Sequence, residues 1–75
     1  MNYNSINDVL SARGILLLDA EQVDSSAALV LCKYNNEYVI WSYMLETGAT
    51  VYGHYYNALD KAVAVYVKKV EEVTS

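Results

Sequence analysis

The sequence predicts an α+β domain in which a short N-terminal helix and a C-terminal amphipathic helix flank an antiparallel meander of three to four strands. β-Branched and aromatic residues dominate residues 27–56, which favours strands there. Two turn signals, at Asn35-Asn36 and at Gly48, divide that stretch, and apolar residues at helical spacing follow Asn57. With 75 residues, no proline and no linker-like segment, residues 1–75 are expected to form one domain.

Residues Ser5–Arg13 are expected to form the N-terminal helix. Ser5 can cap its first turn together with Asp8, three residues further on. Gly14 suits the position after the last turn, because glycine adopts a left-handed conformation without strain. The apolar residues of this segment share one helical face: Ile6, Val9 and Leu10.

The segment that follows is left open by the sequence. Ile15–Asp19 is a short apolar run, and periodicity does not decide whether it is a buried strand. Glu21–Ser26 is polar and is expected to be a loop.

Three strands are expected next, at Ala28–Tyr34, Glu37–Leu45 and Ala49–Tyr56. Asparagine tolerates positive φ, so Asn35-Asn36 can form a two-residue hairpin turn between the first two strands. Gly48 suits the left-handed position of the second turn. The two turns together fix the register of the three strands.

This register divides the strand residues between two faces of the sheet. One face carries no charge and is expected to be the core: Ala28, Val30, Cys32, Val39, Trp41, Tyr43, Val51, Gly53 and Tyr55. On this face Trp41 stands opposite Gly53, so that the indole ring can cover the bare glycine backbone. The other face carries Leu29, Leu31, Lys33, Tyr38, Ile40, Ser42, Met44, Thr50, Tyr52, His54 and Tyr56.

The C-terminal helix is expected to begin after Asn57, a good N-cap residue, with Asp60 in its first turn to complement the helix dipole. Its apolar residues form one stripe: Leu59, Ala62, Val63, Tyr66, Val70 and Val73. The opposite side carries Asp60, Lys61, Ala64, Lys68, Glu71 and Glu72. Many valines lower its intrinsic helix propensity, so this helix should depend on packing against the sheet.

The second sheet face is too apolar for open water, so something is expected to cover it. The N-terminal helix and the Ile15–Leu18 run could cover it within the chain, or both helices could pack on the core face and leave it to a partner. A protein interface is the favoured interpretation, because a chain this short has little material to cover two faces. The predicted interface comprises Leu29, Leu31, Tyr38, Ile40, Met44, Tyr52 and His54.

Cys32 and His54, the only cysteine and histidine, are the first candidates for catalysis or metal binding. The register places them on opposite faces, which excludes a Cys–His pair and a shared metal site. Ser42 shares the face of His54, but it lies in mid-strand without a nucleophile elbow or an orienting carboxylate. No phosphate-binding glycine motif or calcium-loop pattern occurs. We therefore expect no enzyme activity, no metal and no cofactor.

The charge balance limits the possible partners. The formal net charge is −4, from nine acidic residues and five Lys and Arg, whereas phosphate binding depends on clustered basic residues, so nucleic-acid binding is not expected. No apolar run is long enough to span a membrane, and the N-terminus lacks the features of a secretory signal. A single cysteine cannot form an internal disulfide, so the expected location is the cytoplasm.

The order helix, three antiparallel strands, helix resembles that of the double-stranded RNA-binding domain, and the length agrees. That family reads RNA with a basic cluster at the start of its second helix, whereas this sequence has "NALDKAVA" there, with Lys61 beside Asp60. Its function is therefore not transferred. The stretch "YVIWSYMLETGATVYGHYYNALDKAVAVY" also resembles small uncharacterised proteins of bacteria and their phages, in which a hairpin ending in Gly-His-Tyr leads into an acidic-to-apolar helix. That resemblance implies a bacterial or prophage setting and no activity.

The sequence thus predicts a small non-catalytic domain that binds a protein partner or forms a homodimer through the second sheet face. The alternative is a small acidic, phage-type inhibitor that blocks a nucleic-acid enzyme by presenting carboxylates. Such an inhibitor needs a contiguous acidic strip. The acidic residues are instead scattered along the sequence, at Asp19, Glu21, Asp24, Glu46, Glu71 and Glu72.

Overall fold

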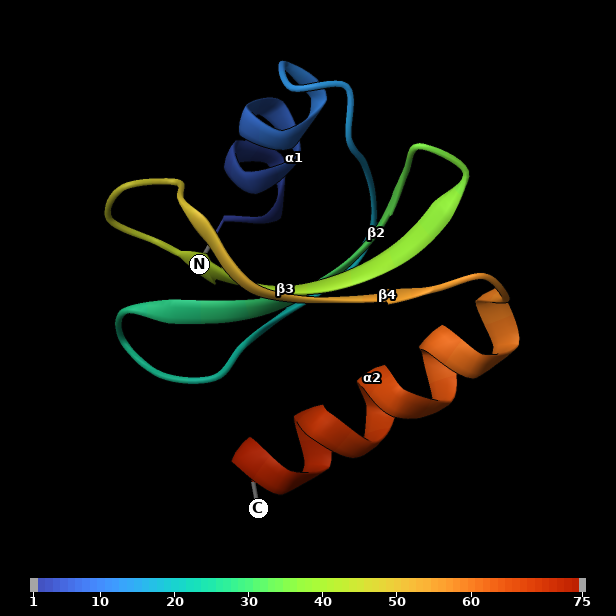
Figure 1. Cartoon of the computed structure of the whole chain (residues 1–75). Coiled ribbons are helices and arrows are strands. Elements are labelled where there is room, and N and C mark those ends of the chain that lie inside the picture. The colour runs from blue at the N-terminus through green and yellow to red at the C-terminus, as the bar shows by residue number, and fades with distance from the viewer. Residues whose placement is uncertain (1, 75) are drawn as a thin grey trace.

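The computed structural model describes residues 2–74, which form two helices and four strands. In chain order these are α1 (Tyr3–Ser11), β1 (Leu16–Gln22), β2 (Ala27–Tyr34), β3 (Glu37–Met44), β4 (Thr50–Tyr56) and α2 (Leu59–Thr74). The strands form one antiparallel sheet in the order β1-β2-β3-β4, so each strand pairs with its neighbours in sequence (Figure 1). The predicted α+β fold is confirmed, with four strands in the meander.

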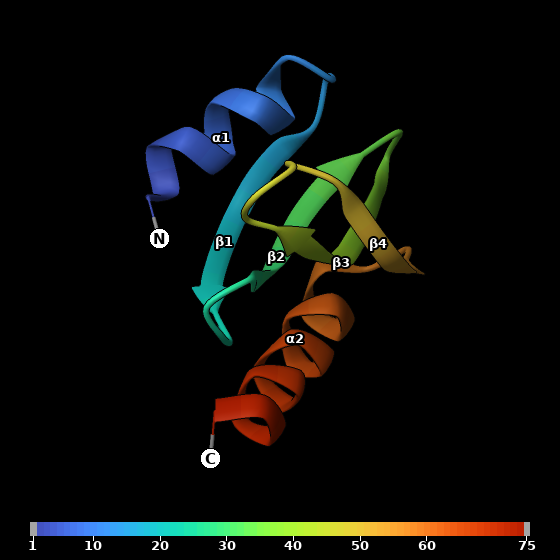
Figure 2. The same ribbon diagram turned by 90° about the vertical axis from the view of Figure 1, so that its left-hand side faces the viewer.

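The two helices lie on opposite faces of the sheet, as Figures 1 and 2 show from two directions. Helix α1 packs mainly on β1, whereas α2 packs mainly on β2, β3 and β4. Both arrangements considered from the sequence are therefore wrong: α2, rather than α1, covers the second face, and the helices do not share a face. One helix on each side allows a sheet with two apolar faces to be buried within a short chain.

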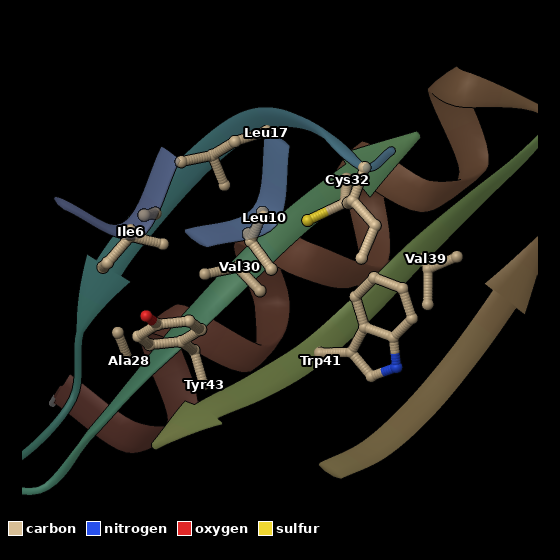
Figure 3. Close-up of a cluster of buried hydrophobic side chains, with 11 residues drawn as sticks. Ile6, Leu10, Leu17, Ala28, Val30, Cys32, Val39, Trp41 and Tyr43 are labelled. Carbon is tan, nitrogen blue, oxygen red and sulfur yellow. The ribbon is translucent and has the colours of Figure 1, made fainter. Parts of the chain in front are cut away.

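The sheet face beneath α1 holds the larger of two buried clusters (Figure 3). This cluster comprises Ile6, Leu10, Ile15, Leu17, Ala20, Ala28, Val30, Cys32, Val39, Trp41 and Tyr43. Trp41 is only 8% exposed, which confirms its predicted place in the core. A Cβ atom built on Gly53 would lie 2.6 Å from Nε1 of Trp41, so the indole ring rests directly on the glycine backbone, as predicted.

Helix α1 begins earlier than the sequence suggests. Asn2, rather than Ser5, is the N-cap, and its side-chain oxygen accepts hydrogen bonds from two backbone N–H groups of the first turn at 2.9 and 3.3 Å. At the other end, Gly14 has a φ of 77° and the N–H of Ile15 donates to the carbonyl of Leu10, as in a Schellman motif. The predicted role of Gly14 is confirmed.

Strand β1 resolves the segment that the sequence leaves open. It extends beyond the apolar run Ile15–Asp19 as far as Gln22, so Glu21 is a strand residue and the loop is limited to residues 23–26. Its register with β2 shifts between Leu17 and Asp19, which marks a β-bulge. The bulge decides which side of the sheet the acidic residues of β1 face, because a shift of one residue exchanges the two faces.

The key residues of both hairpin turns have the predicted φ angles, but Leu45 and Ala49, expected to be strand residues, lie in the loop between β3 and β4. Asn35 and Asn36 have φ angles of 52° and 64°, as a type I′ turn requires, and Gly48 has a φ of 76°. The guanidinium of Arg13 donates a hydrogen bond to the carbonyl of Gly48, which ties the end of α1 to the β3–β4 turn.

Strand β4 differs from the prediction in its first half. Its register with β3 shifts between Ile40 and Ser42, and Tyr52 has a left-handed φ of 57°. Because of this bulge, Val51 pairs with Ser42 and lies on the second face. Thr50 pairs with Tyr43 and lies on the core face instead. Tyrosine is uncommon in the left-handed region, so no turn signal in the sequence marks this position.

Helix α2 begins at Leu59, and Ala58, rather than Asn57, supplies the first helical carbonyl, which accepts from Ala62 N–H at 3.1 Å. Its buried residues are Ala62 and Tyr66. Other residues of the predicted apolar stripe lie at or beyond the edge of the sheet contact.

Candidate protein-binding surface

Helix α2 buries the centre of the predicted interface. Leu29, Leu31 and Ile40 are 9%, 4% and 1% exposed, and they form one cluster with Ala62 and Tyr66 of α2. The sheet face and the helix are both apolar, so they bury each other within the chain. The prediction that these three strand residues form an interface with another protein is therefore wrong.

The other four residues of the predicted interface lie around this cluster or away from it. Tyr38 packs against the cluster and is half-buried, and Met44 is half-buried at the far end of β3. Tyr52 is 80% exposed and His54 is also exposed, on the outer strand β4. The structure therefore brings Tyr38 together with the buried residues and leaves Tyr52 and His54 in solvent.

A different apolar surface is exposed on α2. Leu59, Val63 and Val67 are spaced by four residues, which places them in a row along the helix, and they are 44%, 39% and 47% exposed. We call this row the α2 stripe. Helical geometry places it to one side of the buried residues Ala62 and Tyr66, so it flanks the sheet contact.

The α2 stripe lies on the β1 side of the helix. A cavity of about 150 Å³ between β1 and α2 is lined by Asp19, Glu21, Tyr66, Val67, Val70 and Glu71. Because α2 packs mainly on β2, β3 and β4, it covers little of β1. Leu16, near the start of β1, is accordingly 57% exposed.

Three carboxylates border the α2 stripe near Val67. Asp19 and Glu21 face the α2 side of β1, because their ladder partners in β2 belong to the cluster beneath α2, and Glu71 comes from α2 itself. We call these three residues the carboxylate rim. Lys61 points about 120° around the helix from Val67, whereas Lys68 lies three residues before Glu71 and is therefore its neighbour on the helix surface.

The rim makes its surroundings electrostatically negative. Burial raises the pKa of Tyr66 above its ordinary value, and the nearby charges of Asp19 and Glu21 raise it further. The ammonium of Lys33 lies 5.9 Å from the centre of the Tyr38 ring, and Lys33 pairs with Leu16 at the start of β1. Lys33 lies on the same face of the sheet as Asp19, two residues beyond Leu31, which is the ladder partner of Asp19.

A larger cavity of about 340 Å³ lies beside the start of α1, lined by Asn2, Ser5, Ile6, Gln22, Ser25, Tyr43 and Leu45. The side-chain amides that line this cavity already form hydrogen bonds within the chain: Asn2 caps α1, and Nε2 of Gln22 donates to the carbonyl of Asp24 at 2.9 Å. Its lining contains no carboxylate, imidazole, thiol or amine. It therefore offers little for acid–base or nucleophilic chemistry.

Cys32 and His54 lie on opposite sides of the sheet, as the register predicts. Cys32 is buried beneath α1, and burial raises the pKa of its thiol to about 12, whereas His54 is exposed on β4. Within residues 2–74, no three His, Cys, Asp or Glu side chains are grouped so as to hold a metal ion. The helices of this described part are too short or too polar to cross a membrane.

Both outer strands have protected edges. In β1 the bulge lies next to Asp19, whose carboxylate accepts a hydrogen bond from the N–H of Ala20 at 2.9 Å. In β4 the bulge lies at Tyr52. Bulges and edge charges discourage pairing with a strand of another chain. Each bulge therefore shortens the regular part of the strand edge that could pair with another strand.

The sequence predicts a single apolar face for this helix and therefore does not reveal the α2 stripe. That predicted face includes Leu59 and Val63 but not Val67. The apolar residues of α2 span a wider arc than the sheet contact needs, and that width is the signal that could have found the stripe. The carboxylate rim had no comparable signal, because Asp19 and Glu21 reach it through the bulge in β1.

No family model matches this sequence, and comparisons with curated proteins and with solved structures likewise find no match. The resemblance to small bacterial and phage proteins therefore stays a prediction. Strand β1 departs from the order of one helix, three strands and one helix on which the resemblance to the double-stranded RNA-binding domain rests.

Proposed function

We propose that this chain is a non-catalytic domain that binds another protein through the α2 stripe. The observation that carries this proposal is the exposure of Leu59, Val63 and Val67 in one row beside an uncovered part of the sheet. Apolar residues scattered singly over a surface are ordinary, whereas a continuous row is typical of an interaction site. Completing the burial of each side chain would contribute roughly 1 kcal/mol.

The arrangement of the reactive side chains supports binding rather than catalysis. Cys32 is buried on the α1 side and His54 is exposed on the other, so they cannot act on one substrate. A buried thiol also suits a reducing compartment, and we propose the cytoplasm on that ground.

A different protein fits the α2 stripe better than a second copy of this chain. A homodimer through the second sheet face would require Leu29, Leu31 and Ile40 to leave α2. A homodimer through the α2 stripe would join two chains that each carry a formal net charge of −4, and partners of like charge repel each other.

Site-specific cross-linking in the cells that naturally produce the protein tests this proposal. A photoreactive residue replaces Val67 on the α2 stripe or, as the matched control, the exposed Lys61, which lies about 120° around the same helix. We expect a discrete adduct with one other protein from position 67 alone, and Val63→Glu should remove it. Adducts from both positions, or from neither, would contradict the proposal.

The small acidic inhibitor of a nucleic-acid enzyme is the second candidate. One observation favours it: Asp19 and Glu21 of β1 and Glu71 of α2, two elements far apart in sequence, line a single cavity. If the cross-linked protein is a nucleic-acid enzyme, its nucleic-acid substrate should compete with the adduct. An adduct that excess substrate leaves unchanged would exclude this candidate.

A further inference from the structure

We propose that the α2 stripe and the carboxylate rim receive a basic amphipathic helix of a partner protein, an inference that rests on the proposed protein-binding function. The geometry of the sheet provides the room. The outer strands of a four-stranded sheet lie about 14 Å apart, whereas a helix is about 10 Å wide. Since α2 packs mainly on β2, β3 and β4, a second helix can lie beside it next to β1.

The form of the stripe favours a helix over a strand as the occupant. Leu59, Val63 and Val67 make a ridge at spacings of four residues, and such a ridge packs into the groove between the ridges of another helix. A strand would need free backbone groups along β1. There the bulge interrupts the edge and the Asp19 carboxylate already accepts from the N–H of Ala20.

The carboxylate rim favours a positively charged partner helix. Asp19, Glu21 and Glu71 surround the cavity at the Val67 end of the stripe. Lysine or arginine side chains of the partner can lay their methylene stems on Val67 and Val70 while their charged ends reach these carboxylates. An apolar face flanked by basic residues is therefore the complementary surface.

Other occupants carry the wrong charge. A second copy would add its own formal net charge of −4 to that of this chain, whereas a basic helix would offset that charge. Nucleic-acid phosphates and anionic lipid headgroups would be repelled in the same way. Charge complementarity thus favours a basic protein helix.

Three synthetic peptides of about 18 residues, or five helical turns, serve as probes. The first has a leucine face flanked by lysines, the second has the same face flanked by glutamates, and the third is a scrambled form of the first. Each is titrated into the isotope-labelled full chain while backbone amide chemical shifts are recorded. The lysine peptide should shift the amides of Glu21, Val63 and Val67 and bind about tenfold more tightly than the glutamate peptide. High salt should narrow that difference.

Matched variants separate the rim from the general charge of the protein. The triple substitution Asp19→Asn, Glu21→Gln and Glu71→Gln should abolish the preference for lysine over glutamate. The control triple, Asp8→Asn, Glu37→Gln and Glu46→Gln, removes the same number of carboxylates elsewhere and should keep the preference.

Several results would overturn the inference. These are equal binding of the lysine and glutamate peptides, equal binding of the scrambled peptide, shifts confined to other surfaces, and no saturable binding. Dimerisation of the chain alone that Val67→Glu reverses would identify a second copy as the occupant instead. The cross-linking result is independent of all these titrations, so the inference can fail while protein binding through the α2 stripe stands.

Discussion

The indole ring of Trp41 lies on the backbone of Gly53, with the ring centres of Tyr34 and Tyr55 at 6.3 and 6.2 Å from its own. The Tyr55 ring meets the indole edge-on, at an interplanar angle of 84°. Edge-to-face contacts of this kind contribute beyond simple area burial. This aromatic group lies on the α1 side of the sheet, where α1 packs mainly on β1, and Tyr55 remains 55% exposed.

Gly53→Ala should lower the free energy of unfolding by about 1–3 kcal/mol, because overpacking forces the surrounding side chains to shift. The new methyl carbon would lie 2.6 Å from Nε1 of Trp41, well inside contact distance. Urea unfolding measures the loss. In a Trp41→Phe background the same substitution should cost much less, since the smaller ring leaves room. An equal loss in both backgrounds would show that the indole ring does not limit this position.

Cys32 should make stability fall in alkaline solution. Burial raises the pKa of its thiol from 9.0 to about 12, so the folded state keeps a proton that the unfolded state loses. This contribution is fully present below pH 9 and is lost as the pH rises toward 12. Within that window the slope is about 1.4 kcal/mol per pH unit. Urea unfolding of Cys32→Val should show a shallower decline, and parallel declines would contradict the assignment.

The side chain of a residue decides whether its backbone conformation can be predicted from the sequence. Asn35 and Asn36 carry their turn signal in their own side chains, and the contact between Trp41 and Gly53 follows once the turn fixes the register. Tyr52 carries no such signal, because its left-handed backbone results from pairing with β3 rather than from tyrosine itself. The exchange of Thr50 and Val51 was therefore beyond a reading of local sequence.

At the scale of the elements, α2 depends on a narrow contact with the sheet. Ala62 is fully buried, at 0% exposed, and Tyr66 is 3% exposed, with its hydroxyl donating to the carbonyl of Leu29 at 3.3 Å. A small residue at position 62 lets the helix approach the strands closely. A helix rich in valine has little intrinsic stability, so this contact holds it in place.

Ala62→Leu should destabilise the protein by about 1–3 kcal/mol, because the site has no room for a larger side chain. Ala64→Leu makes the same chemical change on the exposed side of the same helix and should alter stability by less than about 0.5 kcal/mol. Thermal unfolding of the two variants gives the comparison. Similar losses in both would mean that helix propensity, rather than packing, controls α2.

The sequence predicts the existence and type of the helices and of β2, β3 and β4, because periodicity and turn chemistry are local. It does not predict which face α2 covers, since both sheet faces are apolar and either could receive it. It also leaves β1 undecided, because the run Ile15–Asp19 is too short for periodicity to distinguish a strand. These choices depend on contacts between distant segments.

At the scale of the whole molecule, each helix covers only part of one face of the sheet: α1 packs mainly on β1, and α2 packs mainly on β2, β3 and β4. On the α1 side Tyr34 and Tyr55 lie beside Trp41, with Tyr55 itself 55% exposed, and on the α2 side the α2 stripe is exposed. The predicted interface lies on the sheet face that α2 covers. Its central residues, Leu29, Leu31 and Ile40, form the contact with α2.

Burial of the second sheet face within one chain is the claim on which the α2 stripe depends, and two variants measured by thermal unfolding test it most directly. Ile40 is 1% exposed, so Ile40→Glu would bury an unpaired carboxylate and should abolish the folded state. Val67 is 47% exposed, so Val67→Glu should stay folded, with stability within about 0.5 kcal/mol of the parent. A soluble, folded Ile40→Glu protein would contradict the burial of this face by α2.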